Sequence, residues 1–215
     1  MEEWYIVAKY ENLYEVRPIR DLKDMITSSV ELFGEKAAFL VKRGGSADYI
    51  PVSYRQFKQD IDALGTALVN LGLKDKRIAI ISENRYEWNV SYLAVLCGTG
   101  IAVPLDKELP VNEIDNLIKR SAADAVIYSQ NLAEHMDAIR AAYGGIRFIN
   151  MDADQDSGSV LSFSRLMAQG RELLEKGNRL FLDATVDPEV MSILLFTSGT
   201  TDTAKAVMLS QKNIC

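Results

Sequence analysis

The spacing of apolar residues along this chain switches between two patterns, one typical of strands and one typical of helices. Short apolar runs rich in β-branched residues predict strands, and runs with an apolar residue every three to four positions predict helices. The expected strands cover residues 37–42, 49–52, 77–81, 101–105, 125–128, 146–151, 190–196 and 206–209, and the expected helices cover residues 54–71, 86–97, 110–121, 131–142 and 162–176. Their regular order favours parallel strands joined by helical crossovers. The expected fold class is α/β, with a layered, mostly parallel sheet flanked by helices.

The helix expected over residues 54–71 has start and stop signals of its own. Ser53 is followed three residues later by Gln56, which is the pattern of a capping box. Gly72 follows the last apolar position and accepts the positive φ that often ends a helix. One face of the helix carries Tyr54, Phe57, Ile61, Leu64, Leu68 and Leu71.

Length, composition and charge limit the function classes. The chain has 215 residues with 48% hydrophobic content, enough for one large domain or two small ones. A net charge of -6 and the lack of a basic stripe argue against nucleic acid as a partner. Cys97 and Cys215 provide neither a disulfide framework nor a thiol metal site, which indicates a reducing cytoplasm. The acidic start and the short apolar runs predict no signal peptide and no transmembrane segment.

An acidic segment over residues 152–159 interrupts the periodic pattern. Its spacing D-x-D-x-D-x-G resembles the start of a calcium loop, but the twelfth position is Phe163, where a bidentate Glu is needed. We therefore predict a surface loop that is neither a metal site nor a domain boundary.

Several chemically capable side chains have simple structural explanations. Tyr86 and Trp88 are expected to pack in the core. Glu83 and Glu87 lie near a helix start, where acids usually interact with the helix dipole. Ser198 lacks both the G-x-S-x-G elbow and a plausible histidine partner, so we do not expect a nucleophile there.

The strongest motif lies between Leu194 and Ser210, where an apolar run stops at T-S-G-T-T and a single lysine follows. Small residues let backbone N–H groups approach phosphate oxygens, hydroxyls add donors, and Lys205 supplies a positive charge. The expected ligand is a nucleoside triphosphate. The segment is not a Walker A loop, because Lys205 has no glycine beside it. A Ser/Thr-rich turn between two strands is the structural alternative, and the uninterrupted motif makes it the minor one.

This segment resembles the phosphate loop of the AMP-forming acyl-CoA synthetases, whose pattern is aromatic-T-S-G-T-T-G-x-P-K-G-V followed by S-H-x-N. The matching positions are Phe196 to Thr201, Lys205, Val207, Ser210 and Asn213. The departures are Asp202 for Gly, Ala204 for Pro, Ala206 for Gly and Gln211 for His. A second stretch, from Val52 to Ser129, is similar to the N-terminal half of the same superfamily. The first three departures make the loop less permissive in φ and place a carboxylate near the phosphates, which should weaken ATP binding unless Asp202 points away.

The resemblance implies an acid–thiol ligase that converts a carboxylic acid and ATP into an acyl-adenylate and then, with coenzyme A, into an acyl-CoA. The segments at residues 36–42, 82–88 and 103–110 most resemble the corresponding segments of long-chain fatty-acid CoA ligases. The implied phosphate-binding residues are Thr197, Ser198, Gly199, Thr200, Thr201 and Lys205. The implied cofactors are ATP and Mg²⁺, with the metal ligands and the main catalytic groups beyond Cys215.

The resemblance also gives an expected organisation. Residues 1–36 form an N-terminal extension and helix, and residues 37–215 form the N-terminal α/β part of the AMP-binding domain, cut just after the phosphate loop. Family members continue much further, so we expect this chain to be a fragment that is inactive alone. Two alternatives stay open: a degenerate adenylating fold retained as a binding module, and an unrelated nucleotide-binding α/β protein.

Overall fold

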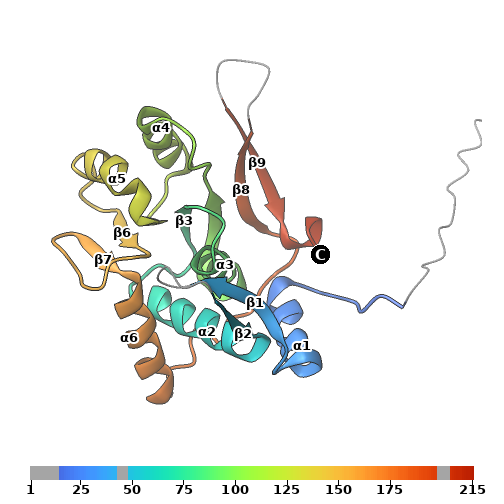
Figure 1. The fold of residues 1–215 in the computed structure, drawn as a ribbon. Helices are drawn as coiled ribbons and strands as arrows, with labels where there is room; N and C mark the ends of the chain where they lie inside the picture. Colours follow the sequence, from blue (N-terminus) through green and yellow to red (C-terminus); the bar gives the residue numbers. More distant parts are fainter. Residues whose placement is uncertain (1–14, 43–47, 198–203) are drawn as a thin grey trace, which may run out of the picture.

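The computed structural model describes residues 15–42, 48–197 and 204–215 as a layered body from which one hairpin projects (Figure 1). Helices are α1 (Leu22–Phe33), α2 (Tyr54–Asn70), α3 (Tyr86–Ala94), α4 (Val111–Ser121), α5 (Ala133–Arg140) and α6 (Phe163–Glu175). Strands are β1 (Ala37–Lys42), β2 (Tyr49–Ser53), β3 (Lys76–Ile81), β4 (Gly100–Pro104), β5 (Ala125–Tyr128), β6 (Arg147–Asn150), β7 (Val160–Ser162), β8 (Met191–Thr197) and β9 (Lys205–Ser210). Short 3-10 turns cover Gln130–Leu132 and Gln211–Asn213. The described helices include none long and apolar enough to cross a membrane.

The main sheet has seven strands in the order β7-β6-β5-β3-β4-β8-β9. All neighbours run parallel except β8 and β9, which form an antiparallel hairpin. Strands β1 and β2 form a separate antiparallel ribbon. The predicted α/β class with a mostly parallel sheet is therefore confirmed.

Both faces of the main sheet are covered, and strand alternation assigns each side chain to a face. Ile78 and Ile80 of β3 enter a core shared with α1, α2, α3 and α6. Ala79 and Ile81 enter a second core shared with α4 and α5. All four side chains are completely buried, because β3 lies in the middle of the sheet with helices on both sides.

Helix α2 follows the predicted signals with one difference. Ser53 Oγ accepts a hydrogen bond from the Gln56 N–H at 3.2 Å, and Gly72 has φ +80° just after the helix. The Gln56 side chain does not complete the capping box, and its Nε2 donates to Asp60 Oδ1 at 3.0 Å. Helix α6 crosses α2 so closely at Gly170 that an added Cβ would lie 1.8 Å from the Ala63 carbonyl oxygen.

Two local features differ from the expected pattern. The helix predicted over residues 86–97 is α-helical only to Ala94 and continues as a π-turn over Val95–Thr99, where Gly98 has φ +151°. Strand β7 was not predicted, because three residues are too few to show a period. The surface loop over residues 152–159 is confirmed, apart from a single bridge between Ser157 and Val160.

Candidate functional site

The β8–β9 hairpin carries the predicted phosphate loop. Thr197, the last residue of β8, faces Lys205, the first residue of β9, as the final pair of the antiparallel ladder. Directly opposite residues in such a ladder have Cβ atoms about 5 Å apart. Both side chains are exposed, so a hydroxyl and an ammonium group meet solvent at the mouth of the loop. Ser198, Gly199, Thr200 and Thr201 were also predicted to bind phosphate, and they lie outside the described residues together with Asp202.

The base of the hairpin is fixed to the body by buried contacts. Ile193 of β8 is 1% exposed and pairs with Ala102 of β4. Gln211, also 1% exposed, accepts a hydrogen bond from the Leu22 N–H at 2.8 Å and donates to the Leu96 carbonyl oxygen at 2.8 Å. Gln211 therefore joins the hairpin base to the start of α1 and to the π-turn.

The loops after the parallel strands form a polar edge. Because β8 runs parallel to β4, its carboxyl end points the same way as the carboxyl ends of β3, β5 and β6. Ligands of open α/β sheets usually bind along this edge. Arg85 Nε binds Glu87 at 2.7 Å, and Arg85 Nη1 binds Asp152 at 2.8 Å. Burial alone would lower the pKa of Arg85, but these two carboxylates outweigh it and raise the pKa.

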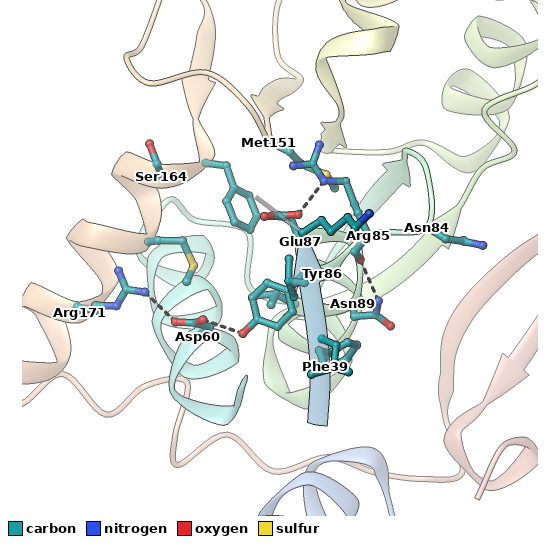
Figure 2. A pocket seen from close by; sticks show the side chains of 16 residues that line it. Phe39, Asp60, Asn84, Arg85, Tyr86, Glu87, Asn89, Met151, Ser164 and Arg171 are labelled. Carbon is teal, nitrogen blue, oxygen red and sulfur yellow. Dashed lines mark hydrogen bonds and ion pairs between the residues drawn. The ribbon is translucent and has the colours of Figure 1, made fainter. Parts of the chain in front are cut away.

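A cavity of about 840 Å³ lies beside this edge, between the β1–β2 ribbon and helices α2, α3 and α6 (Figure 2). Asp60 lies on its wall and is buried. The Tyr86 hydroxyl donates to Asp60 Oδ2 at 2.7 Å, and Arg171 Nη2 donates to Oδ1 at 2.7 Å (Figure 2). With the bond from Gln56, the carboxylate has three donors, which offsets the cost of burying its charge. The cluster thus joins α2, α3 and α6, and Asp60 has a structural role in it.

The predictions for individual polar residues have mixed outcomes. Tyr86 is buried, with its ring edge-on to Phe39 at 5.3 Å, as expected. Trp88 is only half-buried and stacks on Tyr92. Glu83 and Glu87 bind different partners, since Glu83 accepts from the Asn131 amide at 2.7 Å. In the part of the chain that the structure describes, no group of three or more His, Cys, Asp or Glu residues could hold a metal ion.

The chain that forms this layered sheet and its hairpin matches a known protein family over most of its length. Residues 27–215 match the family model described as "AMP-binding enzyme". The chain belongs to the AMP-binding enzyme family. This membership confirms the resemblance seen in the phosphate loop and removes the alternative of an unrelated nucleotide-binding α/β protein.

Several curated relatives of this chain are named as fatty-acid ligases or fatty acyl-CoA synthetases. Long-chain-fatty-acid–CoA ligase 5 of Rattus norvegicus is 31% identical over 76% of this chain and 25% of its own length. Fatty acyl-CoA synthetase A of Dictyostelium discoideum is 28% identical over 81% of this chain and 27% of its own length. A chloroplastic long-chain-fatty-acid–[acyl-carrier-protein] ligase of Arabidopsis thaliana is 24% identical over 89% of this chain and 28% of its own length. The chain spans about a quarter of these relatives.

Solved structures confirm the fold. The adenylation and carrier didomain of a carboxylic acid reductase from Segniliparus rugosus, in complex with AMP, has a TM-score of 0.77 at 17% identity. It is covered over 32% of its length, and this chain over 93%. A long-chain-fatty-acid-CoA ligase from Archaeoglobus fulgidus has a TM-score of 0.75 at 19% identity, covering 93% of this chain and 38% of the ligase. At these identities the likeness concerns the fold alone.

Sequence reasoning did not find the partners that hold the β8–β9 hairpin and the cavity wall. Asp60 had a detectable signal, because it follows Phe57 by three residues and precedes Leu64 by four, which places a carboxylate on the apolar face of α2. Gln211 had no such signal, since its partners Leu22 and Leu96 are more than a hundred residues away.

Proposed function

We propose that this chain is the N-terminal, phosphate-binding part of an enzyme that activates a long-chain fatty acid with ATP. A carboxylate oxygen attacks the α-phosphorus, the bond from that phosphorus to the β-phosphate oxygen breaks, and pyrophosphate leaves as the acyl-adenylate forms. Coenzyme A thiol then takes the acyl group and releases AMP. The observation that carries the proposal is the hairpin mouth, where Thr197 faces Lys205 across a T-S-G-T-T loop.

The residues proposed to hold the β- and γ-phosphates are Thr197, Ser198, Gly199, Thr200, Thr201 and Lys205. Backbone N–H groups and hydroxyls donate to the phosphate oxygens, and the Lys205 ammonium offsets charge that grows on the leaving pyrophosphate. Magnesium, when bound, supplies further charge neutralisation at the phosphates. We place its ligands and the remaining catalytic groups in the part of the enzyme that this chain does not span.

The acyl substrate and the acceptor rest on the relatives' names. Two of those described above are named for long-chain fatty acids and one for fatty acyl groups, which supports this substrate class. The acceptor differs among them, because two names give CoA and one gives acyl-carrier protein. Offering the parent enzyme each acceptor after acyl-adenylate formation separates the two: we expect transfer to coenzyme A, and transfer to carrier protein alone would change the proposed product. Two further points stay predictions: the cytoplasmic location, and the boundary at residue 36 between the N-terminal extension and the α/β part.

The rival proposal is a degenerate adenylating fold that only binds other proteins. Its support is Asp202, a carboxylate in a loop that should hold polyphosphate. Gln211 gives the rival no support, because its side chain is buried between α1 and the π-turn and has a structural role.

Pyrophosphate exchange distinguishes the two proposals. We expect the full-length parent to incorporate labelled pyrophosphate into ATP only when a fatty acid and magnesium are both present. A folded parent that shows no pyrophosphate exchange with fatty acids of any length would favour the binding module.

The chain of 215 residues allows a second test. Without the adenine and magnesium groups, phosphate contacts at an exposed loop are screened, so we expect Mg-ATP to bind no tighter than about millimolar, near 4 kcal/mol. Micromolar affinity in titration calorimetry would show that these residues hold a complete nucleotide site.

A further inference from the structure

A side chain from outside the hairpin contacts both of its strands at the loop. We call Phe196, Thr197, Ala204 and Lys205 the neck of the loop. Arg120 Nη2 donates to the Ala204 carbonyl oxygen at 2.7 Å, and the Arg120 guanidinium carbon lies 5.5 Å from the centre of the Phe196 ring. Phe196 directly precedes Thr197, and Ala204 directly precedes Lys205. One guanidinium therefore donates to the residue that precedes β9 and lies over a ring of β8.

The backbone of Arg120 is anchored to the body of the protein. Arg120 lies in the last turn of α4, which is held in the second core by Ile114, Leu117 and Ile118. The carbonyl oxygen of the next residue, Ser121, accepts a hydrogen bond from Arg77 Nη1 at 2.9 Å. Helix α4 ends immediately afterwards at Ala122, which has φ +49°. The neck is thus connected through Arg120 to the middle of the sheet.

We propose that Arg120 is a positioning residue that keeps Thr197 and Lys205 facing each other across the phosphate loop. This inference rests on the proposed phosphate-binding role of the loop. A planar guanidinium can stack on a ring and donate to a carbonyl at the same time, which a lysine ammonium cannot do with the same geometry. The Ala204 bond is exposed and contributes little to global stability, so its effect is local: it limits opening of the neck.

Amide hydrogen exchange tests the structural half of this proposal in the 215-residue chain. We expect Arg120→Ala to speed exchange at residues 195–197 and 205–207 by about three- to tenfold, and to leave exchange in β3 and β5 unchanged. Lys119→Ala is the matched control, because it removes a positive charge from the same helical turn while Lys119 contacts Asp115 and the Tyr143 ring rather than the neck. Unchanged neck exchange in Arg120→Ala would overturn the proposal.

Mg-ATP titration followed by NMR tests the functional half. We expect the dissociation constant to rise about three- to tenfold in Arg120→Ala and to stay unchanged in Lys119→Ala. Phe196→Leu removes the ring that the guanidinium covers. Like Arg120→Ala, it should both speed exchange at the neck and weaken ATP binding. Arg120→Lys separates position from charge: restored ATP affinity with fast neck exchange would show that only the charge matters, and would overturn the proposal.

The two measurements also separate this inference from the proposed function. If unmodified chain shows no loop shifts with Mg-ATP at tens of millimolar, the phosphate site within this chain is wrong, while neck exchange still reports whether Arg120 holds the hairpin. If ATP binds and Arg120→Ala loosens the neck without weakening binding, the phosphate site stands and the positioning role is wrong.

Discussion

Strand β3 and strand β9 belong to the same sheet and have opposite surroundings. β3 has parallel neighbours on both sides and four side chains with no exposure, from Ile78 to Ile81. β9 is an edge strand, and Met208 on it is 70% exposed. The central strands therefore have the buried area that stabilises the fold, whereas the hairpin holds the loop assigned to chemistry. Because β9 pairs only with β8 and most of its side chains are exposed, single residues such as Gln211 and Arg120 should control the loop end of the hairpin more than they control the fold.

Two methionines test this difference with the same substitution. Met136 on α5 is completely buried, and Met208 on β9 is mostly exposed. We expect Met136→Ala to lower the free energy of unfolding by about 2–5 kcal/mol, because it leaves a cavity in the second core. Met208→Ala should change it by less than about 0.5 kcal/mol. Urea unfolding midpoints at constant slope give both values, and similar losses would mean that the hairpin is as tightly packed as the sheet.

Two strands match their expected bounds. Ala125–Tyr128 lies in the middle of the main sheet, and its four residues are all buried, so it has a local apolar signature. Ala37–Lys42 belongs to the separate β1–β2 ribbon and matches although it is partly exposed. The π-turn at Val95–Thr99 was missed for a physical reason. Its residues are all buried and apolar or small, so their pattern continues that of α3, and only the backbone at Gly98 departs from the helix.

Lys205→Ala in the full-length parent tests whether the hairpin carries the chemistry. We expect acyl-adenylate formation to fall roughly 100-fold, since one charged contact to the leaving pyrophosphate is lost. The melting temperature should stay nearly unchanged, because the Lys205 side chain is exposed. Lys212→Ala is the control: this lysine lies in the turn that follows β9 and pairs with Glu189 at 2.7 Å, away from the loop. An unchanged rate would remove Lys205 from the site, and a large loss of stability would make it structural.

Gln211→Ala should loosen the junction between the two regions. It leaves the Leu22 N–H and the Leu96 carbonyl oxygen buried without their partner, which typically costs about 1–3 kcal/mol. Lys212→Ala, one residue away and exposed, should change the free energy of unfolding by less than about 0.5 kcal/mol. Thermal or urea unfolding measures both variants. Equal values for the two would show that Gln211 does not connect the hairpin to the body.

The site was less predictable than the fold, because its parts come together from distant segments. The T-S-G-T-T motif and Lys205 are close in sequence, so the local motif predicts a phosphate loop, and this stays a prediction. Arg120 is 84 residues from Ala204 and lies on an ordinary polar turn of α4, so no local pattern marks it. The same reason hid the role of Gln211, whose identity drew attention only as a departure from the family pattern. Local periodicity reports which face of an element is buried, and it does not report which remote carbonyl a side chain reaches.

The smallest expected effect concerns Glu83, which follows β3 at the polar edge of the sheet. Burial alone would raise the pKa of Glu83, but the Asn131 amide and the nearby Arg85 charge outweigh it and lower the pKa below its usual value of 4.5. The unfolded chain therefore takes up this proton first as the pH falls, so the contribution of Glu83 to stability is present above about pH 4.5 and is lost as the pH falls through the folded-state pKa. Because the carboxylate is largely solvated, this contribution should be less than about 1 kcal/mol.

Glu83→Gln isolates this charge, because the glutamine oxygen can still accept from Asn131. The unfolding midpoint in urea should differ between the wild-type chain and the variant at pH 6, and the difference should be smaller at a pH well below 4.5, the usual pKa of this carboxyl group. Asn131→Ala provides the control: its pH-dependent loss should be smaller in the Glu83→Gln background than in the wild type, because the two residues share one hydrogen bond. An equal midpoint difference at both pH values would mean that the Glu83 charge is not stabilised at this edge.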